Sequence, residues 1–147
     1  MDHVAIMKKS WGLTQKVLLG QKVIESRWYK NKYRPWNRIE AGDIIYFKDS
    51  GEPISIKAKV KKVLQFENLT PKKVREVLNK YAKDDGVEES RISEFYEMFK
   101  DKKYCLLIFL KDAQDIEPFE INKNGFGNMS AWISIEDIKK IKLSKVV

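Results

Sequence analysis

The sequence predicts an α+β fold in which a mixed or antiparallel curled sheet carries helices at its flanks. Strand-like and helix-like segments follow one another in mixed order along the chain. One 13-residue segment alternates apolar and lysine side chains, and the apolar run YCLLIFL is typical of a central strand. With 147 residues, 43% of them hydrophobic, the chain is expected to form one domain, 1–147.

The N-terminal part is predicted to run strand, helix, strand. Residues 2–7 favour a short strand. Residues 10–20 are expected to form a helix that Ser10 caps and Gly20 ends, because serine is preferred at N-caps and glycine just after helix ends. Residues 23–29 favour a second strand, since they are rich in β-branched and aromatic side chains.

A hairpin is expected next. Segments 43–48 and 54–66 flank the sequence DSGEP, whose residues favour a tight turn. In the second segment the apolar side chains alternate and only Lys62 interrupts them, so one face is expected in the core. The other face shows lysines to solvent, or extends a phosphate-binding track: Lys57, Lys59 and Lys61.

Two helices are predicted in the second half of the chain. Residues 69–82 have apolar side chains at helical spacing, with Thr70 as the N-cap and Pro71 in the first turn. Residues 91–100 show the same spacing. The acidic turn between the helices, 84–90, is expected to be solvated.

The C-terminal part is predicted to contain a strand (103–119), a glycine-bearing loop (122–132) and a short helix capped by Ser134 (134–142). The loop offers candidate ligand contacts, because an asparagine amide can donate to and accept from a base edge and a tryptophan can stack on it. The alternative is that its aromatic residues are hydrophobic plugs. The candidates are Asn128, Ser130 and Trp132.

The net charge of +8 is concentrated in the first part of the chain. Residues 1–83 contain 19 Lys and Arg against 8 Asp and Glu, whereas residues 84–147 contain 10 against 13. A basic surface carried by one part of a domain is typical of proteins with a polyanionic partner. The alternative is that the lysines serve solubility alone.

Residues 27–38, RWYKNKYRPWNR, contain five basic and four aromatic residues and no acid. Cations neutralise phosphates, and rings stack on unpaired bases for about 1–3 kcal/mol each, so this composition suits single-stranded nucleic acid. The alternative is that the tryptophans belong to the core. The predicted stacking residues are Trp28 and Trp36, and the predicted phosphate contacts are Lys22, Lys30, Lys32, Arg34 and Arg38.

Glu25 and Arg27 lie two residues apart on a predicted strand and are therefore expected to share a face. A carboxylate accepts hydrogen bonds from exocyclic amino groups of bases, and a guanidinium can hold that carboxylate or a phosphate. We predict that the two residues recognise a base and that Lys22 reaches the same site. The alternative is a local ion pair on a solvated face.

The residue types needed for a metal centre or an intrachain disulfide are scarce. The chain has one histidine, His3, and one cysteine, Cys105, which is expected to be an inert core thiol. We expect no metal and no cofactor. Because the sequence shows neither a run of about 20 apolar residues nor a signal peptide, a cytoplasmic monomer without membrane contact is expected.

The pattern G-x-K-x-x-E-x-R at residues 20–27 resembles the signature of the ASCH domain family, a branch of the PUA-like superfamily. The stretch GDIIYF, 42–47, resembles the second conserved block of that family. The resemblance implies a PUA-like small mixed or antiparallel β-barrel with flanking helices, a cleft lined by the signature residues and an RNA-related role. It also implies that residues 67–104 are a helical insertion relative to the smallest members.

Some ASCH proteins are amidohydrolases that act on acetylated cytidine, and others are ribonucleases. The amidohydrolases have a Lys-x-x-Thr arrangement with a separate glutamate, whereas this chain has Glu25 in the place of the threonine. In an enzyme, Lys22 and Glu25 would be the catalytic residues, because a buried carboxylate can act as a general base.

Three hypotheses about function agree with these residues. The leading one is a module that binds RNA or a nucleotide and recognises a single-stranded or modified base in a basic, aromatic-lined cleft. The first alternative is an amidohydrolase that acts on an acylated cytidine-like nucleoside. The second is a protein-interaction or regulatory module whose aromatic side chains are buried.

Overall fold

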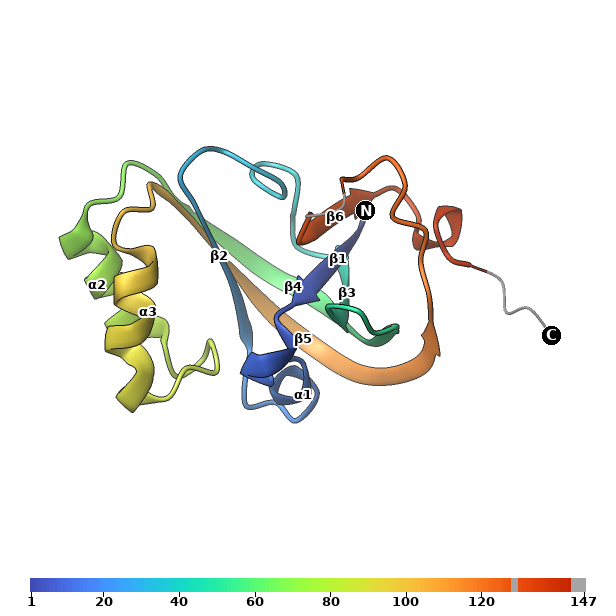
Figure 1. Cartoon of the computed structure of the whole chain (residues 1–147), viewed down its shortest axis with the longest axis horizontal. Coiled ribbons are helices and arrows are strands. Elements are labelled where there is room, and N and C mark those ends of the chain that lie inside the picture. The colour runs from blue at the N-terminus through green and yellow to red at the C-terminus, as the bar shows by residue number, and fades with distance from the viewer. Residues whose placement is uncertain (128–129, 144–147) are drawn as a thin grey trace.

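The computed structural model describes residues 1–127 and 130–143 and shows an α+β fold around a six-stranded mixed sheet, which confirms the predicted fold class. The sheet curls into a half-barrel with the strand order β2-β5-β4-β3-β1-β6 (Figure 1). Strands β1 and β3 are parallel, and all other neighbouring pairs are antiparallel. The strands are β1 (Asp2–Met7), β2 (Ile24–Tyr29), β3 (Ile44–Asp49), β4 (Ile54–Phe66), β5 (Tyr104–Phe119) and β6 (Trp132–Ile135).

The two longest helices, α2 (Pro71–Tyr81) and α3 (Ile92–Phe99), pack side by side at one end of the sheet (Figure 1). Helix α2 begins as predicted, because the Thr70 side chain accepts a hydrogen bond from the backbone N–H of Lys73. The other helical segments are α1 (Leu13–Leu18) and the 3₁₀ turns η1 (Lys9–Trp11), η2 (Glu89–Arg91) and η3 (Ile138–Lys140).

The first part of β5 is buried on both of its faces from Cys105 to Ile108, which explains its continuous apolar run, whereas residues 111–119 are exposed or partly exposed. Leu106 and Ile108 lie in the core inside the half-barrel, together with Phe47 and Trp132. Leu107, on the opposite face, belongs to a second apolar cluster between the sheet and helices α2 and α3. The two helices therefore have their own core, which the sheet shares.

The predicted helix at 10–20 is wrong in its extent. A single 3₁₀ turn, η1, ends at Gly12, whose φ of 64° is left-handed, and α1 begins only after it. Gly12 therefore interrupts the predicted continuous helix. Ser10 lies inside η1 and is not the N-cap of α1. Gly20 has a φ of 74° and does follow the helix end, as predicted.

The predicted helix at 134–142 is also wrong. Residues 132–135 form strand β6, which pairs with β1, and only the 3₁₀ turn η3 follows. The side chain of Asp137, not that of Ser134, caps this turn by accepting from the Lys139 N–H. The buried strand pairing overrides the local helical pattern.

A β-bulge explains the interrupted alternation of β4. Val60 lies opposite Leu110 and Lys62 opposite Phe109, so one extra residue of β4 is accommodated between them. The ammonium of Lys62 lies 4.4 Å from the centre of the Phe109 ring. Within the described residues, no helix is both long and apolar enough to cross a membrane.

The buried His3 of β1 contacts Trp132 of β6 and Asp43, which precedes β3. The ring of His3 is inaccessible to solvent, with Nε2 2.9 Å from Asp43 Oδ2 and Nδ1 3.2 Å from the indole nitrogen of Trp132. Because the Asp43 carboxylate can only accept, the proton of neutral His3 sits on Nε2, and Nδ1 is left to accept from the Trp132 N–H or from the Ser134 hydroxyl 2.9 Å away. Burial lowers the pKa of His3, although the bond and charge of Asp43 oppose this effect.

We expect the protein to lose stability as the pH falls from 7.5 to 5.5. The pKa of His3 is lowered in the folded state, so the unfolded chain binds a proton near pH 6.5 that the native protein does not. His3 is the only histidine, and replacing it should therefore remove most of this dependence. Urea unfolding of the wild type and His3→Gln at both pH values tests this, and parallel pH profiles would contradict it.

Candidate functional site

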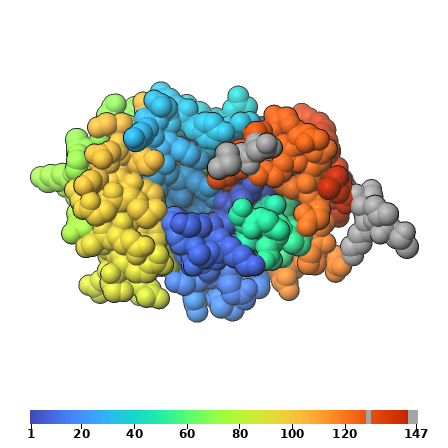
Figure 2. Space-filling view, in the orientation of Figure 1, coloured from blue at the N-terminus to red at the C-terminus, as the bar shows by residue number. Residues whose placement is uncertain are grey.

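A pocket of about 480 Å³ opens between β2 and the opposite side of the half-barrel, where β1 and the chain before β6 lie. Figure 2 shows the hollow near the middle of one face, below the loop of residues 30–40 and above the segment that leads into α1. Since β2 and β6 are the two edge strands of the sheet, the pocket occupies the gap where the half-barrel remains open.

One wall of the pocket is aromatic. Trp28 of β2 stacks on Phe99 of α3 with ring centres 4.9 Å apart and planes within 6° of each other. Trp11 and Phe95 meet edge to face at 5.3 Å on the same wall. Helix α3 thus contributes two phenylalanines to a pocket whose other residues come from β1, η1, α1, β2 and the segments that connect the elements.

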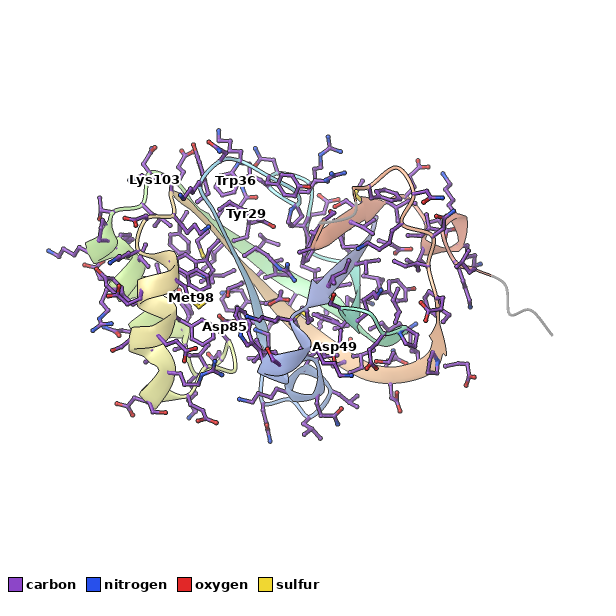
Figure 3. All side chains as sticks on the ribbon, viewed as in Figure 1. Tyr29, Trp36, Asp49, Asp85, Met98 and Lys103 are labelled. Carbon is purple, nitrogen blue, oxygen red and sulfur yellow. The ribbon has the colours of Figure 1, made fainter. Side chains whose placement is uncertain are left out.

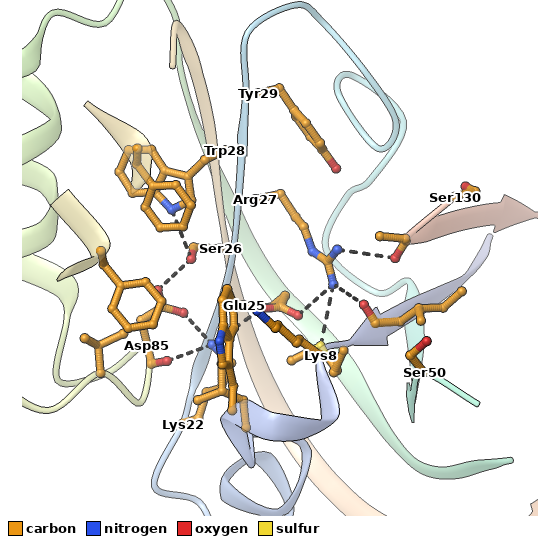
Figure 4. A pocket seen from close by; sticks show the side chains of 18 of the residues that line it. Lys8, Lys22, Glu25, Ser26, Arg27, Trp28, Tyr29, Ser50, Asp85 and Ser130 are labelled. Carbon is orange, nitrogen blue, oxygen red and sulfur yellow. Dashed lines mark hydrogen bonds and ion pairs between the residues drawn. The ribbon is translucent and has the colours of Figure 1, made fainter. Parts of the chain in front are cut away.

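Lys22 lies at the base of the pocket, where its side chain is only 1% exposed. Its ammonium group contacts the Asp85 carboxylate, donates to the Asp85 carbonyl at 2.7 Å and lies 3.4 Å from Glu25 Oε1 (Figure 4). Burial alone would lower the pKa of Lys22, but the two carboxylates outweigh it and raise that pKa. The ammonium is therefore charged, and its three N–H groups are directed at protein acceptors.

Asp85 was expected in a solvated acidic turn, and that prediction is wrong. Its neighbour Asp84 is exposed, but Asp85 turns inward and its Oδ2 accepts from the Ser26 hydroxyl at 2.6 Å. The turn is held against β2 because the N–H groups of Val23 and Ile24 both donate to the Asp84 carbonyl. Burial and the nearby charge of Glu25 raise the pKa of Asp85, while Lys22 opposes them.

Arg27 bridges the open gap of the half-barrel. Its guanidinium lies 3.2 Å from Glu25 Oε2 and donates to the carbonyls of Ile6 and Ala131 at 3.5 and 3.3 Å (Figure 4). The guanidinium carbon also lies 5.1 Å from the centre of the Trp132 ring. Its Nε is the only buried side-chain nitrogen or oxygen within residues 1–127 and 130–143 that has no hydrogen-bond partner. A buried unpaired donor is costly, so a ligand that supplies an acceptor there would be favoured.

The structure brings together about half of the predicted site residues. Lys22, Glu25, Arg27, Trp28 and Ser130 line the pocket. Asn128 lies outside the described residues. The predicted residues that do not line the pocket are Lys30, Lys32, Arg34, Trp36, Arg38 and Trp132.

The loop after β2 places its side chains away from the pocket. Trp36 packs edge to face on Tyr104 at 5.2 Å, and Figure 3 shows it well separated from Asp85. Arg34 lies 5.4 Å from the Tyr33 ring. Lys30, Lys32 and Arg38 are exposed on the same loop and do not line the pocket. Figure 2 shows the loop of residues 30–40 beside the hollow.

Trp132 cannot be the second stacking wall, because it is fully buried. Its place in β6, paired with β1, puts the ring in the core of the half-barrel, where its N–H donates to His3. The sequence-based interpretation also missed Ser26, Asp85, Phe95, Phe99, Lys8 and Lys123, all of which line the pocket. The Asp-Gly pair that begins a tight turn at Gly86, followed by the buried Val87, is the one local signal that residue 85 could turn inward.

We expect Lys22→Met to destabilise the protein by about 3–5 kcal/mol, because it leaves two buried carboxylates without their shared cation. The double variant Lys22→Met/Asp85→Leu should recover much of that loss, since Glu25 still pairs with Arg27. Urea unfolding gives the free energy of unfolding of both variants. Lys72→Met, which removes the charge of an exposed lysine, is the control. An unchanged free energy of unfolding in the single variant would contradict the arrangement.

No protein-family model and no curated protein matches this chain. Several solved structures are similar to it. The structure of the ASCH protein of Zymomonas mobilis matches with a TM-score of 0.65 at 14% identity, and the match covers 95% of this chain and 90% of the Zymomonas chain. A point variant of the same protein has a TM-score of 0.66 at 13% identity, covering 95% and 93%. A hypothetical protein has a TM-score of 0.51 at 22% identity, covering 79% and 100%. The chain therefore has the PUA-like fold of the ASCH domain.

Proposed function

We propose that this protein binds RNA or a nucleotide and receives one unpaired or modified base in the pocket beside β2. The observation that carries the proposal is the pairing of an aromatic wall with a buried carboxylate and guanidinium in one pocket of about 480 Å³. Pockets for small ligands commonly have this size and combine apolar walls with a few polar groups that fix orientation.

The Glu25–Arg27 pair suits a particular kind of base edge. Glu25 offers carboxylate lone pairs, and Arg27 offers a buried Nε–H that has no partner. An acceptor beside a donor is complementary to an amino group next to a ring acceptor, as in cytosine or adenine, and also to the ring N–H next to a carbonyl in uracil. The amino group is the partner that Glu and Asp side chains use when they contact cytosine. The leading ligand is therefore a base with an exocyclic amino group.

Lys22 has a positioning role in this proposal. Because its side chain is almost fully buried and already donates to Asp85 and faces Glu25, it holds the two carboxylates in place and does not reach a ligand. Phosphates of a bound strand would instead meet the cations of the loop after β2, which flanks the pocket mouth: the exposed Lys30, Lys32 and Arg38 and the partly exposed Arg34.

The proposal predicts preference for cytidine over uridine in short single-stranded RNA, by about 1–3 kcal/mol for one bidentate base contact. In Glu25→Gln, an amide replaces one carboxylate oxygen by a donor, so this preference should shrink or reverse. Titration of the intrinsic tryptophan fluorescence, to which the pocket residues Trp11 and Trp28 contribute, measures both affinities. Glu136→Gln is a control that removes a distant exposed acid. Equal affinity for both bases in the wild type would refute the proposed base contact.

Binding of the strand should also weaken with salt. Each phosphate neutralised in single-stranded RNA contributes a slope of about −0.7 to the dependence of log K on log salt. Replacing Arg34 and Arg38 by Gln should make this slope less negative while leaving the preference for cytidine unchanged, because neither residue lines the pocket. Titrations at two salt concentrations test this, and an unaltered slope in the variant would place the phosphates elsewhere.

A second function, hydrolysis of an acylated cytidine-like nucleoside, is favoured by Asp85. This carboxylate lines the pocket, has a raised pKa and lies beside Ser26 and Lys22. It would take a proton from water as the water oxygen attacks the acyl carbon, and the departing amine would take up a proton as the C–N bond breaks. A protein-interaction module with all aromatics buried is less favoured, because Trp11 lines the pocket and is partly exposed, although Trp28 on the same wall is 8% exposed and stacked on Phe99.

For the hydrolase, the direct test is release of acetate from N4-acetylcytidine. Asp85→Asn should abolish turnover, whereas Lys22→Ala is a poor test because the loss of a buried cation also destabilises the fold. Thermal unfolding of Asp85→Asn confirms that it is folded. If the folded wild type releases no acetate, this second function is excluded and base binding is unaffected.

A further inference from the structure

We propose that β4 and β5 carry a second binding surface on the outside of the half-barrel, which contacts the phosphate backbone of a nucleic-acid strand without reading its bases. We call this surface the lysine face, and its residues are Lys57, Lys59, Lys61, Lys62 and Lys111. None of the five lines the pocket, so the inference goes beyond the base-binding function proposed above and does not depend on it.

The strand register directs the lysine face away from the core. Ala58 and Val60 lie on either side of Lys59 along β4 and are buried inside the half-barrel. Lys59 stands directly opposite Lys111 of β5, and both side chains are exposed. Like charges that face each other across two strands destabilise a sheet. The pair is therefore unfavourable in the free protein, and an anion bound over it would remove that cost.

The lysine face has no acidic partner within residues 1–127 and 130–143. None of its five ammonium groups forms an ion pair there, whereas other surface lysines do. Lys73, Lys100 and Lys140 lie 3.7, 2.8 and 2.6 Å from a glutamate oxygen on the same stretch of chain. Neighbouring lysines without carboxylates create a region of positive potential that attracts a polyanion.

The residues of β5 that follow Lys111 do not neutralise it. Asp112 has a left-handed conformation with a φ of 55°, and it forms no ion pair in the part of the chain that the structure describes. Gln114, the next residue of β5 on the lysine face, is neutral. Asp115 stands opposite Ile56, which is buried in the core, and therefore lies on the other face of the sheet. The positive charge of the lysine face is thus left for a ligand.

The lysine face adjoins the basic loop after β2. The end of that loop runs along β4, because Asn37 and Gln65 exchange two hydrogen bonds of 2.8 Å and the N–H of Gly42 donates to the Val60 carbonyl at 2.9 Å. The exposed Arg38 lies between these two anchors in the sequence. A strand that crosses the loop can therefore continue onto the lysine face.

The geometry favours a nucleic-acid strand as the occupant. Lys57 and Lys59 are two residues apart on an extended strand, so their Cα atoms are separated by about 6.6 Å. Successive phosphates of an extended single strand have a similar separation, so each lysine can contact one phosphate. The Lys62 ammonium and the Tyr81 ring lie 4.4 and 6.2 Å from the centre of the Phe109 ring, which is therefore not free to stack on a base. The expected contacts are with phosphates, which carry no sequence information.

Fluorescence anisotropy of a labelled oligouridylate tests the lysine face, since the pocket is expected to prefer cytidine. A length of about 20 nucleotides exceeds the ~4–16 that a small single-strand-binding domain contacts. Replacing Lys57, Lys59 and Lys111 by Gln should make the slope of log K against log salt less negative by about 2, because each phosphate contact contributes about 0.7.

The matched control replaces Lys73, Lys100 and Lys140 by Gln, which changes the net charge equally but removes lysines that already have glutamate partners. Its slope should stay close to that of the wild type. The proposal is refuted if both triple variants change the slope equally, because the effect is then one of net charge alone. It is also refuted if the lysine-face variant keeps the slope of the wild type.

Lys111→Glu separates binding from folding. The new carboxylate faces Lys59 across the strands, and an opposite-charge pair stabilises a sheet, so the variant should unfold at the urea concentration of the wild type or a higher one. Its affinity for oligouridylate at low salt should nevertheless fall roughly tenfold or more, because a phosphate contact is replaced by repulsion. Undiminished affinity in this folded variant would overturn the proposal.

Two further ligands complete the test. Polyglutamate of similar length should bind more weakly than oligouridylate, and equal or tighter binding would assign the lysine face to an acidic protein instead. Free cytidine should bind equally to the wild type and to all lysine-face variants, because none of these residues lines the pocket. If the wild type binds oligouridylate through the lysine face but does not bind cytidine, the base-binding proposal fails and the lysine face stands.

Discussion

The buried contact between Lys22 and Asp85 is the interaction on which the pocket depends. It ties the turn after α2 to the start of β2, and so connects the helical end of the molecule to the half-barrel. A buried ion pair adds little net stability in comparison with apolar residues, but loss of one partner is costly. The contact therefore defines where the turn must lie, and with it the position of Glu25 and Ser26.

The open edge of the sheet creates the second constraint. A half-barrel leaves two strand edges facing a gap, and here Arg27 extends from β2 to backbone carbonyls on the opposite side. Its hydrogen bonds are long, between 3.2 and 3.5 Å, and Nε has no partner among the described residues. The guanidinium is thus held in place while one of its N–H groups has no acceptor, which is a property suited to ligand recognition.

Local patterns in the sequence were sufficient for the fold class and for most elements. The strand at 54–66, the capped helix after Thr70 and the shared face of Glu25 and Arg27 all follow from periodicity or capping chemistry. The failures at 10–20 and 134–142 arose where a left-handed glycine and a long-range strand pairing overrode local preference. That 67–104 is an insertion stays a prediction.

The candidate site was only partly predictable, because its residues come from segments far apart in sequence. The basic and aromatic composition of 27–38 drew attention to a segment of which Arg27, Trp28 and Tyr29 line the pocket, whereas Trp36 packs on Tyr104 outside it. No local pattern could show that Asp85 meets Lys22 and Ser26. These contacts depend on the curl of the sheet and on the turn after α2.

The central claim is that Arg27 and Glu25 contact a base, and the Arg27 Nε–H is its most direct reporter. In a ¹H–¹⁵N spectrum, that resonance should shift markedly when cytidine 5′-monophosphate is added and much less with uridine 5′-monophosphate, because the unpaired donor gains an acceptor only in the correctly oriented base. An Arg27 Nε–H signal that stays unmoved at saturating nucleotide would contradict the account.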